Sequence, residues 1–547
     1  MSVNPVFRGR EAHDYPLLIK QLWHSALRRT PDQEIVYRDL KRFSYRQLRE
    51  RVGRLANVLA GLGVRQGDTV AVMDWDSHRY LESYYAVPMM GAVLMTVNVR
   101  LSPQELIYTI TQSGASVLLL NADFKALIDA IRGELTTVRS YLWLDDQESA
   151  PPTGAGYAGE YERLLAAASP EYEFPDFDEH TRATTFFTTG TTGVPKGVYF
   201  SHRQLVLHTL GVMAACAMGD GSHGFNAKSV YMPMTPLFHV HAWGCPYVAL
   251  LLGVKQVYPG RYVPETLLDL IQREKVTYTH CVPAILQMLL NHPKSHEVDF
   301  NDFSITIGGS ALSSGLAAAA RALGMNIYGG YGMSETCPFL TTAVPHPILG
   351  KLEGDADLKI RCKAGAPAPL VELRVVDANM RDVPEGAPGE VVARSPWLTM
   401  GYTNNESAAH ELWAGGYLHT QDIGYFERGY LKITDRIKDV IKSGGEWVSS
   451  LQLEDLISTH PAVAECGVIG VTDAKWGERP LAIVVAKPGA RVEPDDIRKH
   501  LQASADSGVI PKYAVPERVL IVDSIARTSV GKIDKKKLRQ QYAAAPA

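Results

Sequence analysis

The sequence predicts an α/β protein with a large N-terminal part and a small C-terminal part. The chain has 547 residues, far more than one hydrophobic core usually organises, so two or more domains are expected. Over most of its length, apolar runs of strand length alternate with patterns of helical spacing, which is typical of layered α/β structure. The pattern changes near residue 437, and we predict domains at 1–437 and 438–547.

The clearest element of the N-terminal part is a helix over Tyr45–Gly63, where apolar residues recur at helical spacing. Ser44 and Gln47 have the spacing of a capping box at its start. Residues 149–180 are rich in Ala, Gly, Pro and Glu and lack a sustained period, which indicates a surface connection. Short strands are predicted at Thr69–Met73, Ser116–Leu120, Ser229–Met232 and Ser304–Ile307.

The C-terminal part begins after a charged stretch, Asp435–Lys442, and the Gly444–Gly445 pair. It carries a predicted helix from about Ser450, predicted strands at Ala464–Val471 and Ala482–Lys487, and a basic tail. These elements are enough for a small α+β unit of its own.

Composition excludes several classes of protein. A net charge of -4 gives no reason to expect nucleic acid or a membrane surface as partner. The six cysteines form no CxxC pair, which predicts reduced thiols and no structural metal. Met1–Arg10 lacks an apolar signal core, and no run approaches the roughly 20 apolar residues that cross a bilayer. We therefore expect a cytoplasmic protein.

The strongest chemical signal is a loop of hydroxyls, glycines and one lysine that follows an apolar strand at Thr184–Phe187. Glycines let the backbone approach a ligand, threonines offer donors, and Lys196 adds positive charge, which together suit nucleotide phosphates. A plain Gly/Thr string would be a solvated turn, but Pro195 and Gly197 around the lysine favour phosphate binding. The predicted phosphate-binding residues are Thr188, Thr189, Gly190, Thr191, Thr192, Gly193 and Lys196.

This string resembles the signature loop of the adenylate-forming superfamily, which includes acyl- and aryl-CoA synthetases, peptide-synthetase adenylation domains and luciferases. The resemblance covers nearly the whole chain, because further motifs recur in the family's order. It implies a large N-terminal lobe of several layered subdomains that binds acid and ATP, and a small mobile α+β lobe that carries a catalytic lysine. It also implies that ATP, Mg²⁺ and coenzyme A are bound.

The segment Tyr328–Thr336 resembles the family's second signature. By that likeness Tyr331 stacks on adenine, Ser334 touches the α-phosphate, and Glu335 holds Mg²⁺ together with Thr188. A hard cation prefers carboxylate oxygen and neutralises phosphate charge. A simple strand-to-helix turn with an exposed glutamate would look similar in isolation. Other residues implied along the nucleotide are Gly309, Ser310, Gly330, Gly332 and Met333.

Four positions after residue 420 resemble family residues with known roles. Asp422 and Arg436 match the pair that reaches the ribose, since one carboxylate can accept both sugar hydroxyls. Lys438 matches the interdomain hinge. Lys532 matches the lysine that the small lobe inserts between carboxylate and α-phosphate. Outside this context each would be an ordinary solvated residue. The implied catalytic residues are Lys196, His239, Glu335 and Lys532.

The run Met234–Gly244 resembles the family's acid-pocket motif. His239 is expected as a pocket wall that rearranges between steps, and His241 as structural. Trp243 resembles the gate tryptophan of long-chain acyl-CoA synthetases, although core packing fits it equally. The implied acid-binding residues are His239, Trp243, Gly309, Gly330 and Trp397, and those implied beside the pantetheine arm of CoA are Gly445, Glu446 and Trp447.

The resemblance implies a ligase that converts an acid, ATP and CoA into acyl-CoA, AMP and diphosphate through an acyl-adenylate. The tryptophan motifs are similar to those of medium- and long-chain fatty acyl-CoA synthetases and of methylmercaptopropionate-CoA ligases, so both acid classes stay open. An amino-acid or aryl-acid adenylating enzyme and a nucleotide-binding homologue without catalysis are the alternatives. Phe238–Tyr247 offers no acidic residue for a substrate ammonium, which disfavours an amino acid. Dimers occur in the long-chain branch, so a homodimer is among the expected states.

Overall fold

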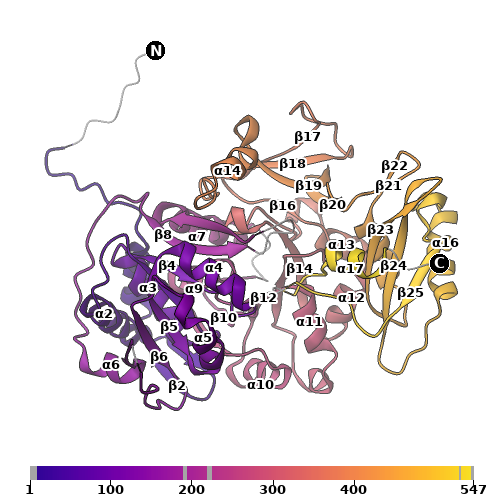
Figure 1. Ribbon diagram of the computed structural model, residues 1–547. Helices are drawn as coiled ribbons and strands as arrows, with labels where there is room; N and C mark the ends of the chain where they lie inside the picture. Colours follow the sequence, from indigo (N-terminus) through magenta and orange to yellow (C-terminus); the bar gives the residue numbers. More distant parts are fainter. Residues whose placement is uncertain (1–8, 155, 189–193, 219–223, 529–530, 544–547) are drawn as a thin grey trace.

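The computed structural model describes residues 9–154, 156–188, 194–218, 224–528 and 531–543. In these ranges the strands form four sheets, three within residues 34–436 and one within residues 441–521 (Figure 1). The predicted layered α/β class is confirmed. The predicted boundary at residue 437 falls between the third and the fourth sheet, and as a domain limit it stays a prediction.

The first large sheet has seven strands, and its interior strands are parallel and buried, as is usual when helices cover both faces. Its last two strands form an antiparallel hairpin at one edge. In spatial order the strands are β7 (Tyr157–Glu160), β6 (Ser140–Leu144), β5 (Ala115–Asn121), β3 (Thr69–Met73), β4 (Val93–Thr96), β8 (Arg182–Thr188) and β9 (Lys196–Ser201).

The second large sheet has nine strands, of which β14, β13, β12, β10, β11 and β1 run parallel. In spatial order they are β16 (Ala366–Pro367), β15 (Thr341–Thr342), β14 (Asn326–Tyr331), β13 (Ser304–Ile307), β12 (Tyr278–Cys281), β10 (Val230–Tyr231), β11 (Lys255–Tyr258), β1 (Glu34–Tyr37) and β2 (Lys41–Ser44).

Helix α3 (His78–Met89) joins the two large sheets. All of its residues are buried, and it contacts β1 of one sheet and β3, β4 and β8 of the other. The remaining helices of the large lobe are α1 (Trp23–Arg29), α2 (Tyr45–Gly61), α4 (Pro103–Ser113), α5 (Lys125–Ile131), α6 (Tyr161–Ala167), α7 (His202–Cys216), α8 (Val240–Trp243), α9 (Cys245–Leu252), α10 (Pro264–Glu274), α11 (Pro283–Leu290), α12 (Ser314–Ala322), α13 (Gly354–Arg361) and α14 (Glu406–Leu412).

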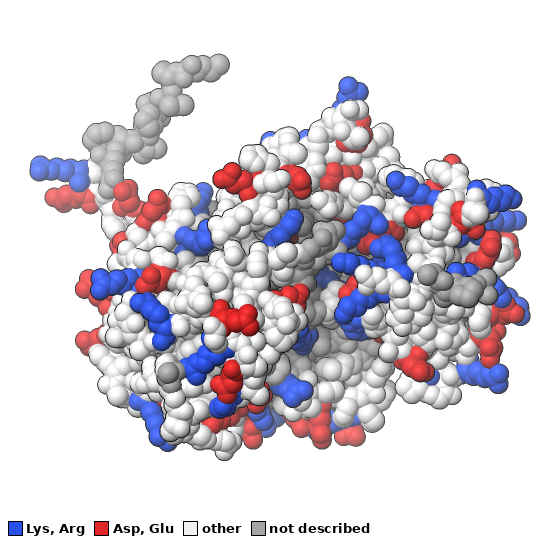
Figure 2. Space-filling view, viewed as in Figure 1, with Lys and Arg blue, Asp and Glu red and all other residues white. Residues whose placement is uncertain are grey.

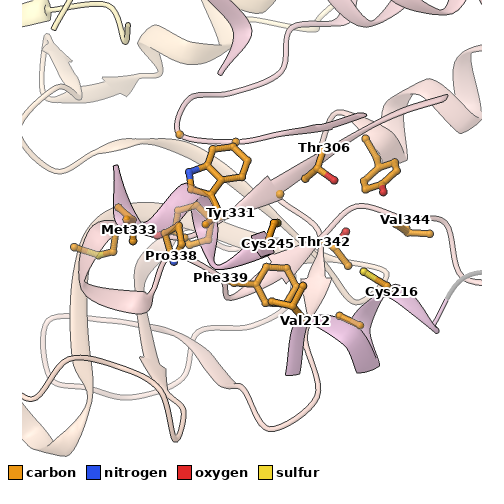
Figure 3. A pocket seen from close by; sticks show the side chains of 18 of the residues that line it. Val212, Cys216, Cys245, Thr306, Tyr331, Met333, Pro338, Phe339, Thr342 and Val344 are labelled. Atoms are coloured by element: carbon orange, nitrogen blue, oxygen red, sulfur yellow. The ribbon is translucent and has the colours of Figure 1, made fainter. Parts of the chain in front are cut away.

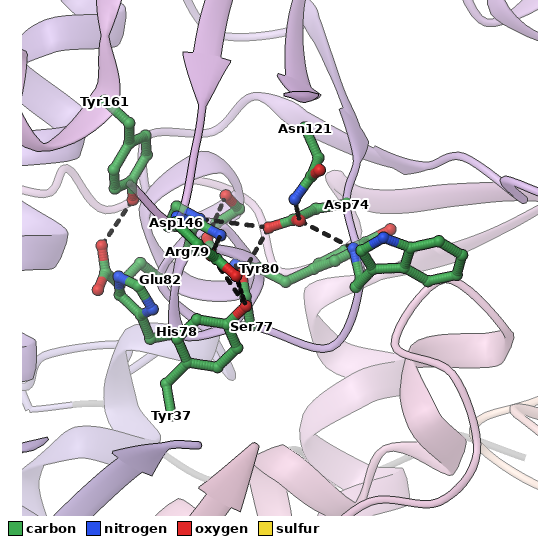
Figure 4. A network of polar contacts seen from close by, with 12 residues as sticks. Tyr37, Asp74, Ser77, His78, Arg79, Tyr80, Glu82, Asn121, Asp146 and Tyr161 are labelled. Carbon is green, nitrogen blue, oxygen red and sulfur yellow. Dashed lines mark hydrogen bonds and ion pairs between the residues drawn. The ribbon is translucent and has the colours of Figure 1, made fainter. Parts of the chain in front are cut away.

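A buried polar network also bridges the sheets at the carboxyl ends of β1, β3, β5 and β6 (Figure 4). The Arg79 guanidinium lies 2.7 Å from an Asp146 oxygen and 3.5 Å from an Asp74 oxygen. Tyr37 donates to Asp146 at 3.0 Å, and Asn121 donates to Asp74 at 2.6 Å. Because a buried charge is costly without partners, this network fixes how the two sheets meet.

The third sheet contains β17 (Glu372–Val376), β18 (Gly389–Arg394), β19 (Leu418–Glu427) and β20 (Tyr430–Arg436). The fourth, with its own hydrophobic core, forms the C-terminal lobe, which lies beside α11, α12 and α13 in Figure 1. Its elements are β21 (Ile441–Ser443), β22 (Glu446–Val448), α15 (Ser450–Ser458), β23 (Val463–Asp473), β24 (Gly477–Ala486), α16 (Pro494–Asp506), β25 (Arg518–Ile521) and α17 (Lys535–Tyr542).

Most predicted elements are present. The capping box of Ser44 and Gln47 is confirmed, and the helix after it ends at Gly61, two residues before the predicted end. The prediction of a surface connection over residues 149–180 is wrong in part: β7 and α6 lie there, and Tyr161 is buried with its hydroxyl 2.6 Å from Glu82. Within the described ranges, no helix combines the length and apolar character needed to span a bilayer.

Candidate active site

A cavity between the two lobes contains residues from distant parts of the sequence (Figure 3). One end is mainly apolar and is formed by Val212, Cys216, Cys245, Phe339 and Val344, with Thr306 and Thr342 beside them. The other end carries polar groups, from His239, Tyr331, Ser334 and Lys532. Figure 2 shows Lys and Arg side chains along the C-terminal side of the hollow between the lobes. A cavity with one apolar and one polar end suits a ligand with an apolar tail and a charged head group.

The β8–β9 hairpin places Thr188 directly opposite Lys196, and the Thr188 hydroxyl lies 3.4 Å from the Lys196 carbonyl oxygen. The predicted phosphate-binding residues Thr189, Gly190, Thr191, Thr192 and Gly193 lie outside the described residues. The hairpin therefore presents a hydroxyl and an ammonium group from adjacent strands.

Glu335 lies in the short turn after β14 and is nearly inaccessible to solvent. The Tyr402 hydroxyl donates to Glu335 Oε1 at 2.7 Å, and Lys196 Nζ lies 4.8 Å from the centre of the same Tyr402 ring. Thr403 N–H donates to the Gly197 carbonyl at 2.8 Å, which ties this segment to the hairpin. Tyr402 thus connects the carboxylate in the turn after β14 with the ammonium group of Lys196 on β9.

The site around Glu335 fits a Mg²⁺ ion that is held partly by a bound nucleotide and not by the protein alone. In the described part of the chain, no cluster of three or more His, Cys, Asp or Glu could enclose a metal ion. Mg²⁺ is usually held by one or two carboxylates together with phosphate oxygens and waters. Within the described ranges Tyr402 engages Oε1 and no partner is seen for the other carboxylate oxygen, which suits it to a cation brought in with a nucleotide.

Asp422 is the centre of a second polar cluster, on β19. Its Oδ2 accepts from the Tyr331 hydroxyl at 2.7 Å, and its Oδ1 lies 3.1 Å from Arg436 Nε on the paired strand β20. Burial raises the pKa of Asp422, and the Arg436 charge acts in the opposite direction. Two lone-pair positions of the carboxylate are used, so capacity remains for ligand hydroxyls.

Lys532 of the C-terminal lobe lines the same cavity. A Cβ atom placed on Gly309 would lie 3.3 Å from Lys532 Cε, so the glycine leaves room for the lysine stem. Burial and the nearby Arg436 lower the pKa of Lys532 to about 8, while Asp422 and Glu335 oppose that shift. An ammonium in this position is strongly attracted to any anion that enters.

His239 and Trp243 line the cavity from an unusual turn. Val240, His241, Ala242 and Trp243 all have φ between +46° and +57°, so α8 is a single left-handed turn. Such backbone costs roughly 1–2 kcal/mol per residue for L-amino acids. Burial lowers the pKa of His239 to about 3, so its ring is neutral at physiological pH.

Several other predicted site residues lie around the cavity or away from it. Gly309, Gly330, Gly332, Met333 and Ser334 line it, whereas Ser310 does not. Trp397 is fully buried behind the wall, where its indole N–H donates to the Phe339 carbonyl at 2.9 Å. Its expected direct contact with an acid therefore finds no support in this geometry.

The residues predicted for the hinge and for CoA lie on the surface of the molecule. Lys438 is exposed in the turn that follows β20. Gly445, Glu446 and Trp447 belong to the β21–β22 hairpin, and the Trp447 side chain is 54% exposed. None of them lines the cavity in this lobe orientation, and their roles stay predictions.

Tyr402 is the site residue that the sequence analysis missed. In this part of the chain the family resemblance points only to Trp397. Tyr402 is far along the chain from both Glu335 and Lys196, so no sequence pattern indicates that it contacts them. A tyrosine after a glycine close to a predicted motif is the one local feature that could have drawn attention to it.

Comparisons with known proteins identify the class. A model of the AMP-binding enzyme family matches residues 22–403, and a model of the AMP-binding enzyme C-terminal domain matches residues 452–532. The first match covers most of the chain. The protein therefore belongs to the AMP-binding enzyme family, and the predicted membership of the adenylate-forming superfamily is confirmed.

Individual relatives are similar over nearly the full length. The chain is 40% identical to a long-chain-fatty-acid–CoA ligase of Thermus thermophilus, over 92% of this chain and 91% of that protein. It is 35% identical to a 3-methylmercaptopropionyl-CoA ligase of Ruegeria pomeroyi, over 96% of this chain and 97% of that protein. The solved structure of ATP-bound MatB from Rhodopseudomonas palustris superimposes with a TM-score of 0.81 at 25% identity. The match covers 96% of this chain and 98% of that one. The predicted adenylate-forming fold is confirmed.

Proposed function

We propose that this protein is an ATP-dependent, AMP-forming acyl-CoA ligase that acts on an unbranched aliphatic or thioether acid. The observation that carries the proposal is that Lys532, from the small lobe, lines one cavity with Tyr331, Ser334 and an apolar pocket. The family models and the relatives confirm the predicted enzyme class. The individual residue roles below belong to the proposal.

In the first half-reaction a carboxylate oxygen of the acid attacks the α-phosphorus of ATP. A bond from oxygen to phosphorus forms, the bond to the β-phosphate oxygen breaks, and diphosphate leaves. Lys532 orients the carboxylate and the α-phosphate and offsets the charge that develops there, while Lys196 binds the departing phosphates. Glu335 and Thr188 would hold Mg²⁺, which when bound would supply charge neutralisation on the phosphates.

Recognition of the nucleoside is assigned to the cluster around Asp422. The carboxylate accepts the ribose hydroxyls, Arg436 holds that carboxylate in place, and Tyr331 packs against the base. Because Asp422 is already fixed by two partners, 2.7 Å and 3.1 Å away, little side-chain ordering is left for binding.

In the second half-reaction the CoA thiolate attacks the acyl carbon of the adenylate, and AMP leaves with the electron pair of the broken carbon–oxygen bond. We assign to Lys438 the hinge about which the C-terminal lobe rotates between the two halves. That rotation withdraws Lys532 and brings the turn with Gly445, Glu446 and Trp447 toward the pantetheine arm. One cleft then serves two unlike transition states.

The apolar end of the cavity supports the choice of acid. Among the described residues, no carboxylate lines it that could pair with a substrate ammonium, which disfavours an amino acid. The named relatives act on a long-chain fatty acid and on 3-methylmercaptopropionate. Each buried methylene contributes only about 0.8 kcal/mol, so an apolar pocket accepts neighbouring chain lengths. The cytoplasmic location and the homodimer stay predictions.

The test is a panel of acids assayed for diphosphate release and for thioester, each with and without CoA. We expect thioester from straight-chain fatty acids and from methylmercaptopropionate, and weak turnover with benzoate. ATP turnover only with amino acids, or diphosphate release that never leads to thioester, would contradict the proposal.

A further inference from the structure

The C-terminal lobe contacts one connection of the large lobe at both of its ends. This connection runs from β13 to α12. Near its start, Gly309 accommodates the stem of Lys532. At its end, Ser314 and Gly315 in the first turn of α12 meet Asp455 and Ser458 of α15. The two contacts are therefore mechanically linked through a short piece of chain.

Asp455 closes the N-terminus of α12 from the opposite lobe. Its Oδ1 accepts from the Ser314 backbone N–H at 2.7 Å, and its Oδ2 accepts from the Ser314 hydroxyl at 3.2 Å. Ser314 is the first residue of α12, where the helix exposes unpaired N–H groups and the positive end of its dipole. A carboxylate in this position makes charge-assisted hydrogen bonds that exist only while the lobes have this orientation.

Gly315 provides independent support for a dedicated contact. A Cβ atom on Gly315 would lie 2.3 Å from the Ser458 carbonyl oxygen and 3.0 Å from its carbon. Real Cβ contacts are not that short, and the three closest atoms all belong to Ser458. An isolated helix would prefer alanine to glycine by about 0.5–1 kcal/mol. The glycine therefore serves the packing of α15 against α12 and not the helix itself.

From these observations we infer that Asp455 is a positioning residue for adenylation: it locks α15 onto α12 and so keeps Lys532 seated beside Gly309. The inference rests on the proposed function, in which Lys532 acts in the first half-reaction only. The lock must open before the lobe can rotate for the second half-reaction. Its strength then sets how much of the enzyme is ready to form the adenylate.

The experiment measures the two half-reactions separately in Asp455→Ala and Gly315→Ala. We expect both variants to form acyl-adenylate about tenfold more slowly. Asp455→Ala loses a charge-assisted hydrogen bond, and Gly315→Ala places a Cβ against the Ser458 carbonyl oxygen and pushes α15 away. Conversion of presynthesised acyl-adenylate and CoA to thioester should be unchanged or faster. Thermal unfolding midpoints close to that of the unchanged protein would show that folding is intact.

Ser313→Ala is the matched control. The Ser313 hydroxyl caps the same helix from inside the large lobe, by accepting from Leu316 N–H. If the variants acted only by weakening α12, this change would slow adenylation equally, and the inference would be overturned. Wild-type adenylation rates in both test variants, or equal loss in both half-reactions, would also overturn it. Absence of adenylate with every acid in the unchanged protein would instead refute the proposed function on which it rests.

Discussion

The two ends of the cavity are built in different ways. Beside the end that contains Tyr331, which we propose for the nucleotide, Asp422, Tyr331 and Arg436 hold one another through hydrogen bonds and an ion pair, and Glu335 is held by Tyr402. At the end proposed for the acid the wall is mainly apolar, and a left-handed turn supplies Trp243 to the cavity. The end proposed for the nucleotide is thus held by hydrogen bonds and an ion pair before any ligand binds, whereas apolar packing is the main constraint on the end proposed for the acid. Changes at the first should affect every acid alike, and changes at the second should reorder the acids.

The largest effect is expected for Lys532→Ala. Adenylation should slow by about 10³-fold, because an ammonium that meets the developing charge is lost. Thioester formation from presynthesised acyl-adenylate should remain within a fewfold of the unchanged protein. Rapid-quench measurement of each half-reaction checks this, and equal loss in both would refute the assigned role.

Asp422→Asn should lower kcat/KM for ATP by about 10²-fold, since a buried charge-assisted hydrogen bond is lost and Arg436 is left unpaired. The loss should be the same for short and long acids. Asp382→Asn is the control, because Asp382 pairs with Arg374 at 2.7 Å but is largely exposed. A loss that varied with acid length would contradict the division between the two ends.

Tyr402→Phe keeps the ring beside Lys196 and removes the hydroxyl that holds Glu335. We expect adenylation to fall about tenfold, the value of one hydrogen bond to a carboxylate, with the thioester half-reaction unchanged. Tyr199→Phe on the neighbouring β9 serves as control. An effect of similar size in the control would show that Tyr402 has no special role.

Val212→Ala should produce the smallest change, and one of a different kind. Removal of two methyl groups enlarges the apolar end, so kcat/KM should shift toward acids longer by one or two carbons, by about fourfold per methylene. kcat/KM for ATP should not move. Leu210→Ala, whose side chain on the same helix is 40% exposed, should change neither quantity.

The sequence predicted those parts of the fold and site that depend on local pattern. The capping box at Ser44 and the strand before Thr188 were visible because neighbouring residues determine them. The strand and helix between Tyr157 and Ala167 were missed, because their short apolar pattern is hidden among Ala and Gly. Tertiary packing, which no local pattern encodes, determines the secondary structure of these residues.

The site residues also divide into those that a local motif predicts and those that only tertiary packing brings together. The motif around Tyr331 pointed to the cavity, which Lys532 also lines, and Asp422 lies behind it in contact with the Tyr331 hydroxyl. The contact of Tyr402 with Glu335 could not be predicted, because it depends on how the segment between β18 and α14 packs against the turn after β14. Trp397 was expected to meet the acid, yet it lies behind Phe339, since a tryptophan in a motif gives no indication of the direction of its side chain.

The left-handed turn at α8 links acid selectivity to the whole interior of the large lobe. A chain of L-amino acids would leave this geometry if it were free, so the tightly packed neighbours of Val240 and Ala242 impose it. Substitutions that loosen that distant packing will therefore relax the turn first. They will become visible as a changed order of preferred acids while nucleotide affinity is still intact.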